Sequence, residues 1–282
     1  MRLGVLVLPT DPWPVAVARA QAVERLGYHH LWTYDHLSWR RYREQTWFAA
    51  LPWLTGIAAA TSRVRLGTMV ASPNFRHPVT FAKEAMTLDH VSGGRLTLGI
   101  GAGGTGYDAT VLGGQILSPG ERATRLADFV AATDLLLRSP AATYRGTRYT
   151  VDEARMIPGC VQQPRLPLAV AAAGRRTIRL VARCADAWIT TGDAATVRTH
   201  GDWLAAECAA AGRDPAEIDR IILVTNAHGR PLSSVDAFVD FVGRYAELGF
   251  TDVVFHDPRP GDPVWTEPPE IVDEIAAALL TG

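Results

Sequence analysis

Apolar runs of strand length alternate with longer segments of helical periodicity along the whole chain. The first run, residues 3–9, is continuously apolar, which is typical of a strand whose two faces are both buried. Residues 15–26 follow with helical spacing, and Gly27 is placed to end that helix. The same alternation predicts further strands at residues 31–36, 64–71, 96–102, 167–173, 187–191, 221–226 and 252–256.

Helices are predicted in the intervals between these strands. The run Ser118-Pro119-Gly120-Glu121 has the composition of a helix start, so residues 119–138 are expected to form a long helix. The other expected helices are residues 45–61, a helix that starts at His77-Pro78, and residues 175–184, 194–211, 235–248 and 270–280.

Eight strand–helix alternations in one chain of this length predict an α/β fold, the (β/α)8 TIM barrel. The alternative is a doubly wound open sheet, which usually has fewer strands and a glycine-rich first turn that this chain lacks. Residues 139–165 are the one long irregular stretch, and Tyr144–Tyr149 within it predicts a short hairpin inserted before the fifth strand. We expect residues 1–282 to form a single domain of this kind.

The composition narrows the class of protein further. Hydrophobic residues make up 48% of the chain and the net charge is −1, which favours a large core over binding to nucleic acid or an anionic membrane. Cys160, Cys184 and Cys208 lack the spacing of a disulfide framework or a zinc site, which favours a reducing cytoplasm. Residues 1–9 are too few to cross a bilayer and are expected to be a strand rather than a signal peptide.

The most informative stretch is residues 64–103, which is expected to fold as strand, helix and strand. Pro73 ends the first strand, and Pro78 lies in the first helical turn, where a missing N–H costs least. The second strand ends in a run of glycines, Gly99, Gly101, Gly103 and Gly104. Glycines at this position would let a ligand approach the backbone closely, or they would simply form a tight turn.

Five short elements of this stretch resemble the bacterial luciferase-like flavin and deazaflavin oxidoreductases. They are Arg76-His77-Pro78, Ala82–Ala85 (AKEA), Leu88-Asp89, Ser92–Leu96 (SGGRL) and Leu98–Gly103 (LGIGAG), in the order and spacing of that family. The resemblance implies a TIM barrel that holds a flavin-type cofactor and a small organic substrate at the carboxyl ends of its strands.

Asp35-His36 follows the second strand and is the strongest candidate for chemistry. A histidine can hold or supply a proton near neutral pH, beside a hydride acceptor. The structural alternative is that Asp35 caps the next segment while His36 packs against Trp39. In deazaflavin-dependent members of the family, the matching Asp-His pair contacts the cofactor ring, the His handles a proton, and a nearby Trp lines the pocket. The resemblance therefore assigns catalytic roles to Asp35, His36 and Trp39, with the first two also binding the cofactor.

The resemblance also implies a backbone feature at the end of the third strand. Relatives have a non-prolyl cis peptide under the cofactor's central ring, which by position should lie at Met69-Val70 or one residue to either side. Ser72 and Gly103 are expected to converge with Asp35 and His36 at the same mouth of the barrel.

The cofactor's phosphate is expected at the start of the helix after the fifth strand. Free N–H groups at a helix N-terminus attract anions, and two arginines reinforce this attraction. In relatives the matching Ala-Ala-Gly binds the phosphate through its backbone, which assigns this role to Ala172, Ala173 and Gly174, followed by Arg175 and Arg176. The alternative is a solvated basic face.

A metal-hydrolase barrel is a competing interpretation, because His36, His77 and His256 all lie near strand ends. We expect no metal, since the first strand carries no His-x-His and no bridging carboxylate or lysine is evident. His77 belongs to the Arg-His-Pro element, where a helix-start role is expected.

The chain also departs from the family's sugar-phosphate dehydrogenases. Those enzymes carry a glutamate where this chain has Gly104, and their phosphate-binding lysines have no match at Thr191–Asp193. A glucose-phosphate substrate is therefore disfavoured, and Tyr107 and Asp108 are the candidates to contact substrate or cofactor.

Taken with its compact length, the chain is expected to be an oxidoreductase that uses the deazaflavin coenzyme F420. The alternatives are an FMN-dependent monooxygenase supplied with reduced flavin, and a flavin-binding protein without catalysis. Relatives are often dimers, so a homodimer is the expected assembly.

Overall fold

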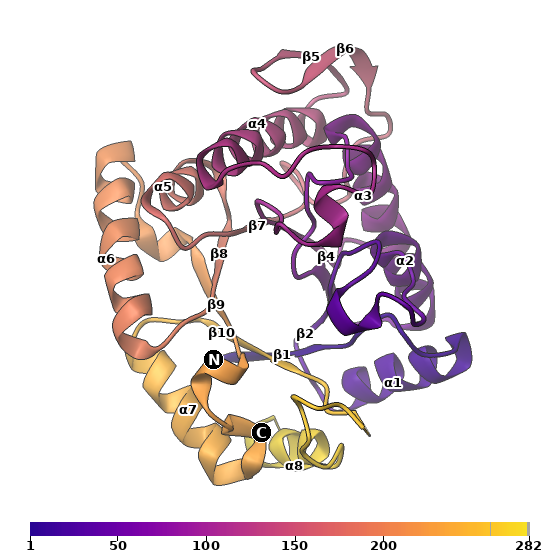
Figure 1. The fold of residues 1–282 in the computed structure, drawn as a ribbon, viewed down its shortest axis with the longest axis vertical. Helices are drawn as coiled ribbons and strands as arrows, with labels where there is room; N and C mark the ends of the chain where they lie inside the picture. Colours follow the sequence, from indigo (N-terminus) through magenta and orange to yellow (C-terminus); the bar gives the residue numbers. More distant parts are fainter. Residues whose placement is uncertain (260, 281–282) are drawn as a thin grey trace.

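The protein folds into a closed barrel of parallel strands, as seen down its axis in Figure 1. The computed structural model describes residues 1–259 and 261–280. In spatial order the barrel strands are β1 (Arg2–Leu6), β10 (Asp252–His256), β9 (Asp219–Leu223), β8 (Ala187–Thr190), β7 (Leu168–Ala171), β4 (Leu96–Ile100), β3 (Arg65–Thr68) and β2 (His30–Thr33).

The barrel closes where the two ends of the chain meet. β1 pairs in parallel with β10, with Arg2 opposite Asp252 and Leu6 opposite His256, and it pairs with β2 on its other edge. The prediction of a (β/α)8 barrel is confirmed, and the open sheet is wrong because a doubly wound sheet would leave β1 and β10 unpaired with each other.

Helices surround the barrel and mostly match the predicted ranges. They are α1 (Trp13–Arg25), α2 (Ala50–Ala60), α3 (Pro78–Ser92), α4 (Pro119–Arg138), α5 (Arg175–Cys184), α6 (Ala194–Ala211), α7 (Val235–Glu247) and α8 (Ile271–Leu279). Among the described residues, none of them is both long enough and apolar enough to cross a membrane.

The second helix begins later than predicted. α2 starts at Ala50, because the residues before it are drawn into an extended loop by contacts with other loops. The Phe48 N–H donates to Pro9 O at 2.8 Å, and the Trp47 indole N–H donates to His36 O at 2.8 Å. The partners in these two contacts, Pro9 and His36, lie outside residues 45–61, so the helical periodicity of that stretch could not reveal them.

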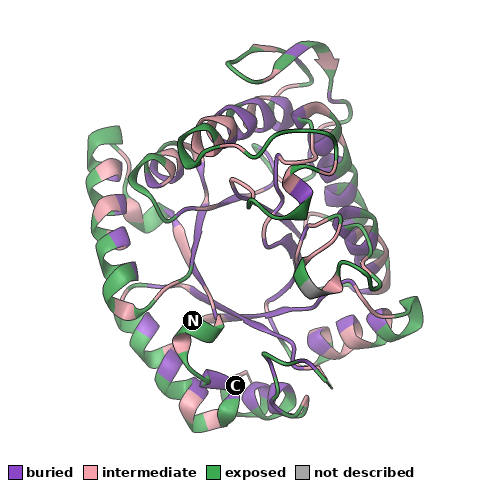
Figure 2. Ribbon diagram, viewed as in Figure 1, coloured by how far each residue is buried: buried purple, intermediate pink, exposed green. Residues whose placement is uncertain are grey.

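Two apolar layers hold the structure together, one inside the barrel and one between strands and helices (Figure 2). Trp32 is fully buried inside the barrel, and a Cβ added at Gly67 would lie 2.2 Å from its ring. Large residues such as Leu6, Met69 and Ile189 and small ones such as Ala169 share this interior cluster. Ala171, at the carboxyl end of β7, lines the cavities described below.

The irregular stretch before β7 contains the predicted hairpin. β5 (Ala141–Arg145) pairs antiparallel with β6 (Thr150–Arg155), and Figure 1 shows this hairpin projecting beyond α3 and α4. Asp89 of α3 fixes the following segment by accepting bonds from the N–H groups of Val161 and Gln162, at 2.8 and 3.1 Å. The insertion is thereby tied to the outside of the barrel.

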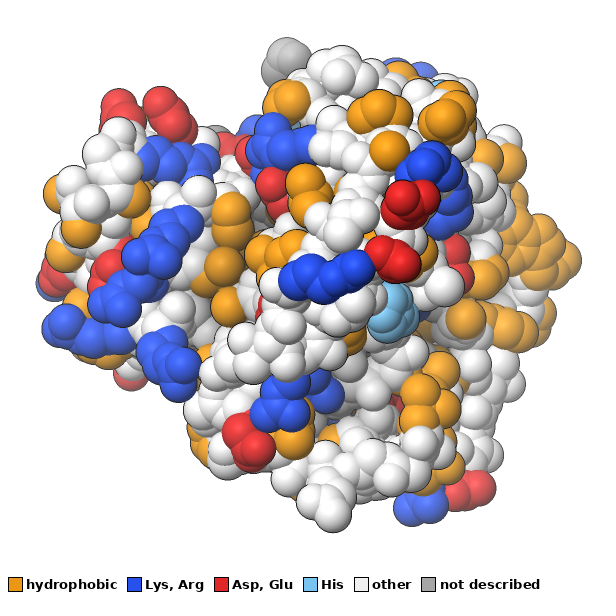
Figure 3. Space-filling view, turned by 90° about the horizontal axis from the view of Figure 1, so that it is seen from above, with side chains coloured by type: hydrophobic (Ala, Val, Ile, Leu, Met, Phe, Trp, Pro, Cys, Tyr) orange, Lys and Arg blue, Asp and Glu red, His pale blue; other side chains and the backbone are white. Residues whose placement is uncertain are grey.

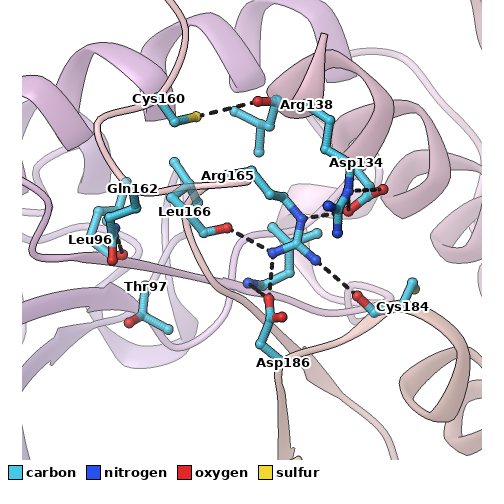
Figure 4. Close-up of polar contacts among 12 residues, drawn as sticks. Leu96, Thr97, Asp134, Arg138, Cys160, Gln162, Arg165, Leu166, Cys184 and Asp186 are labelled. Atoms are coloured by element: carbon cyan, nitrogen blue, oxygen red, sulfur yellow. Dashed lines mark hydrogen bonds and ion pairs between the residues drawn. The ribbon is translucent and has the colours of Figure 1, made fainter. Parts of the chain in front are cut away.

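A buried arginine anchors the end of the insertion (Figure 4). The guanidinium of Arg165, a residue 4% exposed, contacts Asp134 of α4 at 2.5 Å and also pairs with Asp186. It donates as well to Leu166 O at 2.9 Å and Cys184 O at 3.0 Å. Because this buried cation is paired and hydrogen-bonded, it locks α4, α5 and the entry into β7 together.

Candidate active site

The loops that follow the barrel strands enclose connected cavities at one mouth. A cavity of about 320 Å³ shares Met69, Val70 and Ala171 with a second cavity of about 260 Å³ that extends toward Ala172 and Ala173. It shares His36 and Asp108, among others, with a third of about 430 Å³. We call these three cavities the groove; the predicted site residues that line it are His36, Trp39, Met69, Val70, Ser72, Gly103, Gly104, Tyr107, Ala172 and Ala173.

Asp35 does not line the groove. It is 1% exposed, and its two carboxylate oxygens accept from Nε and Nη2 of Arg76 at 2.7 and 2.8 Å. The guanidinium of Arg76 also lies over the rings of Phe75 and Phe81, at 5.2 and 5.0 Å. The sequence analysis expected Asp35 to face the cofactor ring or His36, whereas the structure turns it inward to Arg76.

His36 turns the opposite way and meets Asp108. The His36 Nδ1 lies 2.5 Å from the Asp108 Oδ2, and the Asp108 Oδ1 accepts from the N–H groups of Leu37 and Ser38 at 3.1 and 3.3 Å. The His36 side chain is 31% exposed, while Asp108 is 6% exposed. A half-exposed imidazole bonded to a buried carboxylate is thus placed on the wall of the groove.

Aromatic rings support His36 from the loop after β2. The Trp39 ring stacks on the imidazole with centroids 5.9 Å apart and planes 20° apart, and Tyr42 stacks on Trp39 at 6.0 Å. Tyr34 lies 4.8 Å from Trp39, and its hydroxyl lies 2.8 Å from the His256 Nε2. Burial raises the pKa of Tyr34, so the hydroxyl stays protonated.

The predicted cis peptide is confirmed at Met69-Val70, directly after β3. Both residues line the two smaller cavities of the groove. Met69 belongs to the interior apolar cluster with Trp32 and Ile189, so the floor of the groove is apolar.

The glycine run after β4 serves packing more than ligand approach. A Cβ at Gly99 would lie 1.8 Å from Thr68 O, and one at Gly101 would lie 2.5 Å from the Val70 side chain. A Cβ at Gly103 would meet the Ser72 hydroxyl at 2.4 Å. These three glycines let β4 and the residues after it pass close to the end of β3. Gly101 and Gly103 also line the groove, as does Gly104, where an added Cβ would have no atom nearer than 3.9 Å.

The start of α5 follows Ala172 and Ala173, which line the cavity of about 260 Å³, but Gly174, Arg175 and Arg176 line none of the three cavities. Thr177 and Gly174 bond reciprocally there, with the Gly174 N–H donating to the Thr177 Oγ1 at 3.3 Å. Arg175 lies over the Trp203 ring at 4.9 Å, and Arg176 donates to the Thr124 Oγ1 at 3.2 Å. Both arginines are exposed, and Figure 3 shows Lys and Arg side chains gathered on the left, the side where α5 and α6 lie in Figure 1.

The remaining histidines have other partners. His77 is the N-cap of α3 and its Nδ1 accepts from the Val79 N–H at 3.3 Å, which confirms the expected helix-start role. His29 and His30 lie before and at the start of β2, at the opposite end of the barrel, where their Nδ1 atoms are 2.9 Å apart. Asp252 lies close to them, but Arg2 occupies both of its carboxylate oxygens, at 2.8 and 2.6 Å.

A further cavity at this mouth, of about 670 Å³, lies beside the groove. The loops after β1, β2 and β10 line it, with Arg19, Tyr42 and Asp257 among its residues. Two of the lining residues bond to each other: the Arg19 Nε donates to the Asp257 Oδ2 at 2.9 Å. None of the predicted site residues lines it.

Two site contacts escaped the sequence analysis. Arg76 belongs to the Arg-His-Pro element, which was read only as a helix start, and nothing local marks it as the partner of Asp35. Trp47 holds the backbone of His36, because its indole N–H donates to His36 O. Arg76 lies 41 positions from Asp35, so only the folded barrel brings that pair together.

Comparison with known proteins adds an independent line of evidence. A family model described as luciferase-like monooxygenase matches residues 1–236. An F420-dependent glucose-6-phosphate dehydrogenase of Beutenbergia cavernae is 30% identical over 290 residues, covering 84% of this chain and 85% of the relative.

Two solved structures share the fold over nearly the whole chain. An F420-dependent secondary alcohol dehydrogenase in complex with an F420-acetone adduct has a TM-score of 0.83 at 17% identity, covering 97% of each chain. A monooxygenase from Streptomyces bottropensis has a TM-score of 0.77 at 21% identity, covering 99% of each chain. The family model matches residues 1–236, which include most of the barrel and the residues that line the groove. The chain therefore belongs to the luciferase-like monooxygenase family.

Proposed function

We propose that the protein is an oxidoreductase that exchanges a hydride between coenzyme F420 and a small organic substrate. The observation that carries this proposal is the groove itself, which combines an apolar floor with a proton-handling imidazole and adjoins an anion-attracting helix start. The relative from Beutenbergia cavernae, which is named for its F420 dependence, supports the choice of cofactor.

The residues of the groove fit a deazaflavin. Its aromatic ring system needs an apolar surface, and Met69, Val70 and Ala171 provide one where two cavities join. Its phosphate needs N–H donors and positive charge, which the start of α5 offers. The residues we propose to hold the cofactor are His36, Met69 and Val70, Ser72, Gly103 and Gly104, Tyr107, Ala172, Ala173, Gly174 and Arg175. Asp35, expected from the sequence to bind the cofactor, acts only through its bond to Arg76.

When bound, F420 would supply the hydride acceptor or donor, and the protein would supply orientation and proton handling. His36 holds or delivers a proton at its imidazole, on the wall of the groove. Trp39 stacks on His36 and limits the water that reaches it. Asp35 contributes by fixing the end of β2 through Arg76, which sets the direction in which His36 points.

We also propose that residues 1–282 act as one domain, because the barrel needs strands from both ends of the chain. The substrate would enter through the cavity of about 430 Å³, which continues from His36 toward Arg40, Arg43 and Tyr107.

The test is single-turnover hydride transfer with the protein loaded with reduced F420. Acetone is the first probe, because a structural neighbour was solved with an F420-acetone adduct; other small ketones follow. We expect loss of the reduced cofactor's absorbance with wild type, and a rate about 100- to 10,000-fold lower for His36→Ala.

Cofactor affinity should fall far less than the rate in His36→Ala. If His36 is instead a structural residue that only packs against Trp39, the variant will melt at a lower temperature and transfer hydride at the wild-type rate per folded molecule. That pattern would overturn the proposed role of His36.

A further inference from the structure

We infer that Asp108 is the positioning residue of His36, fixing the imidazole with its Nδ1 proton toward Asp108 and its Nε2 free to exchange a proton. This assignment rests on the proposed function, because proton handling matters only if the groove carries out the reaction. It also gives Asp108 a role different from the direct contact with substrate or cofactor expected from the sequence.

The geometry of Asp108 leaves it little freedom. The residue belongs to a short 3-10 turn, η2 (Tyr107–Ala109), in the loop after β4, and it is 6% exposed. One carboxylate oxygen lies 2.5 Å from the His36 Nδ1, and the other accepts from two backbone N–H groups of the loop after β2. Both oxygens are therefore engaged before any ligand arrives.

The chemistry of the pair determines the tautomer of His36. An ionised carboxylate can only accept hydrogen bonds, so the proton in the short contact must come from Nδ1. No hydrogen bond to the His36 Nε2 is found among residues 1–259 and 261–280. Since His36 lines two cavities of the groove, Nε2 is the atom that can exchange a proton with a bound molecule.

The charges around His36 make Asp108 decisive. Within the described residues it is the one acid that lines either cavity facing the imidazole. The other ionisable groups lining them are Tyr34, Arg40, Arg43 and Tyr107, and the two arginines disfavour a charged imidazole. Removing the Asp108 carboxylate should therefore release the imidazole ring from this orientation.

The test uses ¹⁵N nuclear magnetic resonance of the histidine side chains in the cofactor-free protein, so it does not depend on turnover. In wild type we expect the neutral His36 as the Nδ1–H tautomer. Asp108→Asn keeps an oxygen for the Leu37 and Ser38 N–H groups, but its amide donates toward Nδ1, which moves the proton to Nε2. We expect the ¹⁵N shifts of His36 to report this change of tautomer in the variant.

Kinetics with F420 and the best ketone substrate give a second readout. Asp108→Asn should lower kcat by about 100-fold or more, with F420 affinity unchanged. Glu44→Gln is the matched control, because Glu44 is an exposed acid in the loop after β2, and it should change neither the tautomer nor kcat.

The assignment is overturned if wild-type His36 is the Nε2–H tautomer, a result that needs no variant to fold. It is equally overturned if His36 in Asp108→Asn keeps the wild-type tautomer and the variant keeps the wild-type kcat. A protein that shows the expected tautomers but does not bind F420 would contradict the proposed function and, with it, the catalytic purpose of the Asp108–His36 bond. The two failures are therefore distinguishable.

Discussion

At the scale of single residues, Asp35 and His36 are adjacent in sequence but bind different partners on opposite sides of the chain. Asp35 points inward to Arg76, which lies 41 positions away, and His36 points outward to Asp108, which lies 72 positions away. The pair could be singled out from sequence because it follows an apolar strand. Its partners could not be, because no local pattern records which loops meet at the mouth of a closed barrel.

Arg76→Met tests the buried pair with Asp35. The variant leaves a carboxylate that is 1% exposed without its counterion, so we expect a loss of about 3–5 kcal/mol in the free energy of unfolding. Urea denaturation measures it. Asp152→Asn is the control, since Asp152 pairs with Arg145 at the surface with 77% of its side chain exposed, and should cost at most about 1 kcal/mol. Equal losses in the two variants would contradict the buried-pair account.

The buried His30 predicts how stability depends on pH. Burial lowers the pKa of His30 well below its usual value, with the charges of His29, Arg65 and Arg2 acting the same way. The unfolded chain therefore binds more protons below about pH 6.5, so the free energy of unfolding should fall as the pH drops from about 6.5 toward 5. Burial lowers the pKa of His29, His200 and His228 in the same direction.

Urea denaturation at a series of pH values checks this, with His30→Asn as the comparison. The variant should show a smaller fall in stability across the same interval, because it lacks the group that titrates. A wild-type protein that becomes more stable on acidification in this range would refute the assignment.

At the scale of elements, local signals account for what the sequence predicted well. α4, α5 and α6 have their predicted bounds, and two of them begin with side-chain caps, from Ser118 with Glu121 and from Asp193. Strand ends were less accurate, since a strand stops where its neighbour stops pairing. Two residues of the family motifs form structural contacts away from the groove. Lys83 donates to Arg155 O at 2.8 Å, and Arg95 donates to Ala58 O at 2.8 Å.

Gly99→Ala tests the packing of β4 against β3. Its new Cβ would lie 1.8 Å from Thr68 O, a backbone atom that cannot move without disturbing the ladder, so we expect a loss of about 1–3 kcal/mol or more. Thermal unfolding measures the change. Gly106→Ala is the matched control in the next loop, because its Cβ would have no neighbour within 4 Å. If both variants melt at the same temperature, the close approach of the two strands is wrong.

At the scale of the whole molecule, the fold could be predicted and the groove could not. Eight alternations of strand and helix were enough to predict the barrel, and the family motifs identified the end that carries the site. The volume and connection of the cavities depend on which side chains of several loops and strand ends meet, such as Met69, Val70 and Ala171, which line two of the cavities. The homodimer and the cytoplasmic location stay predictions.

The central claim, that the groove binds F420 with its phosphate at the start of α5, is tested most directly by fluorescence titration with F420 and with FMN. We predict saturable F420 binding, weaker FMN binding, and an F420 affinity about 10-fold or more lower in Arg175→Ala/Arg176→Ala, as a lost charge-assisted bond requires. Arg183→Ala, at the other end of α5, should bind as wild type. Tighter binding of FMN, or unchanged F420 affinity in the double variant at low salt, would contradict the account.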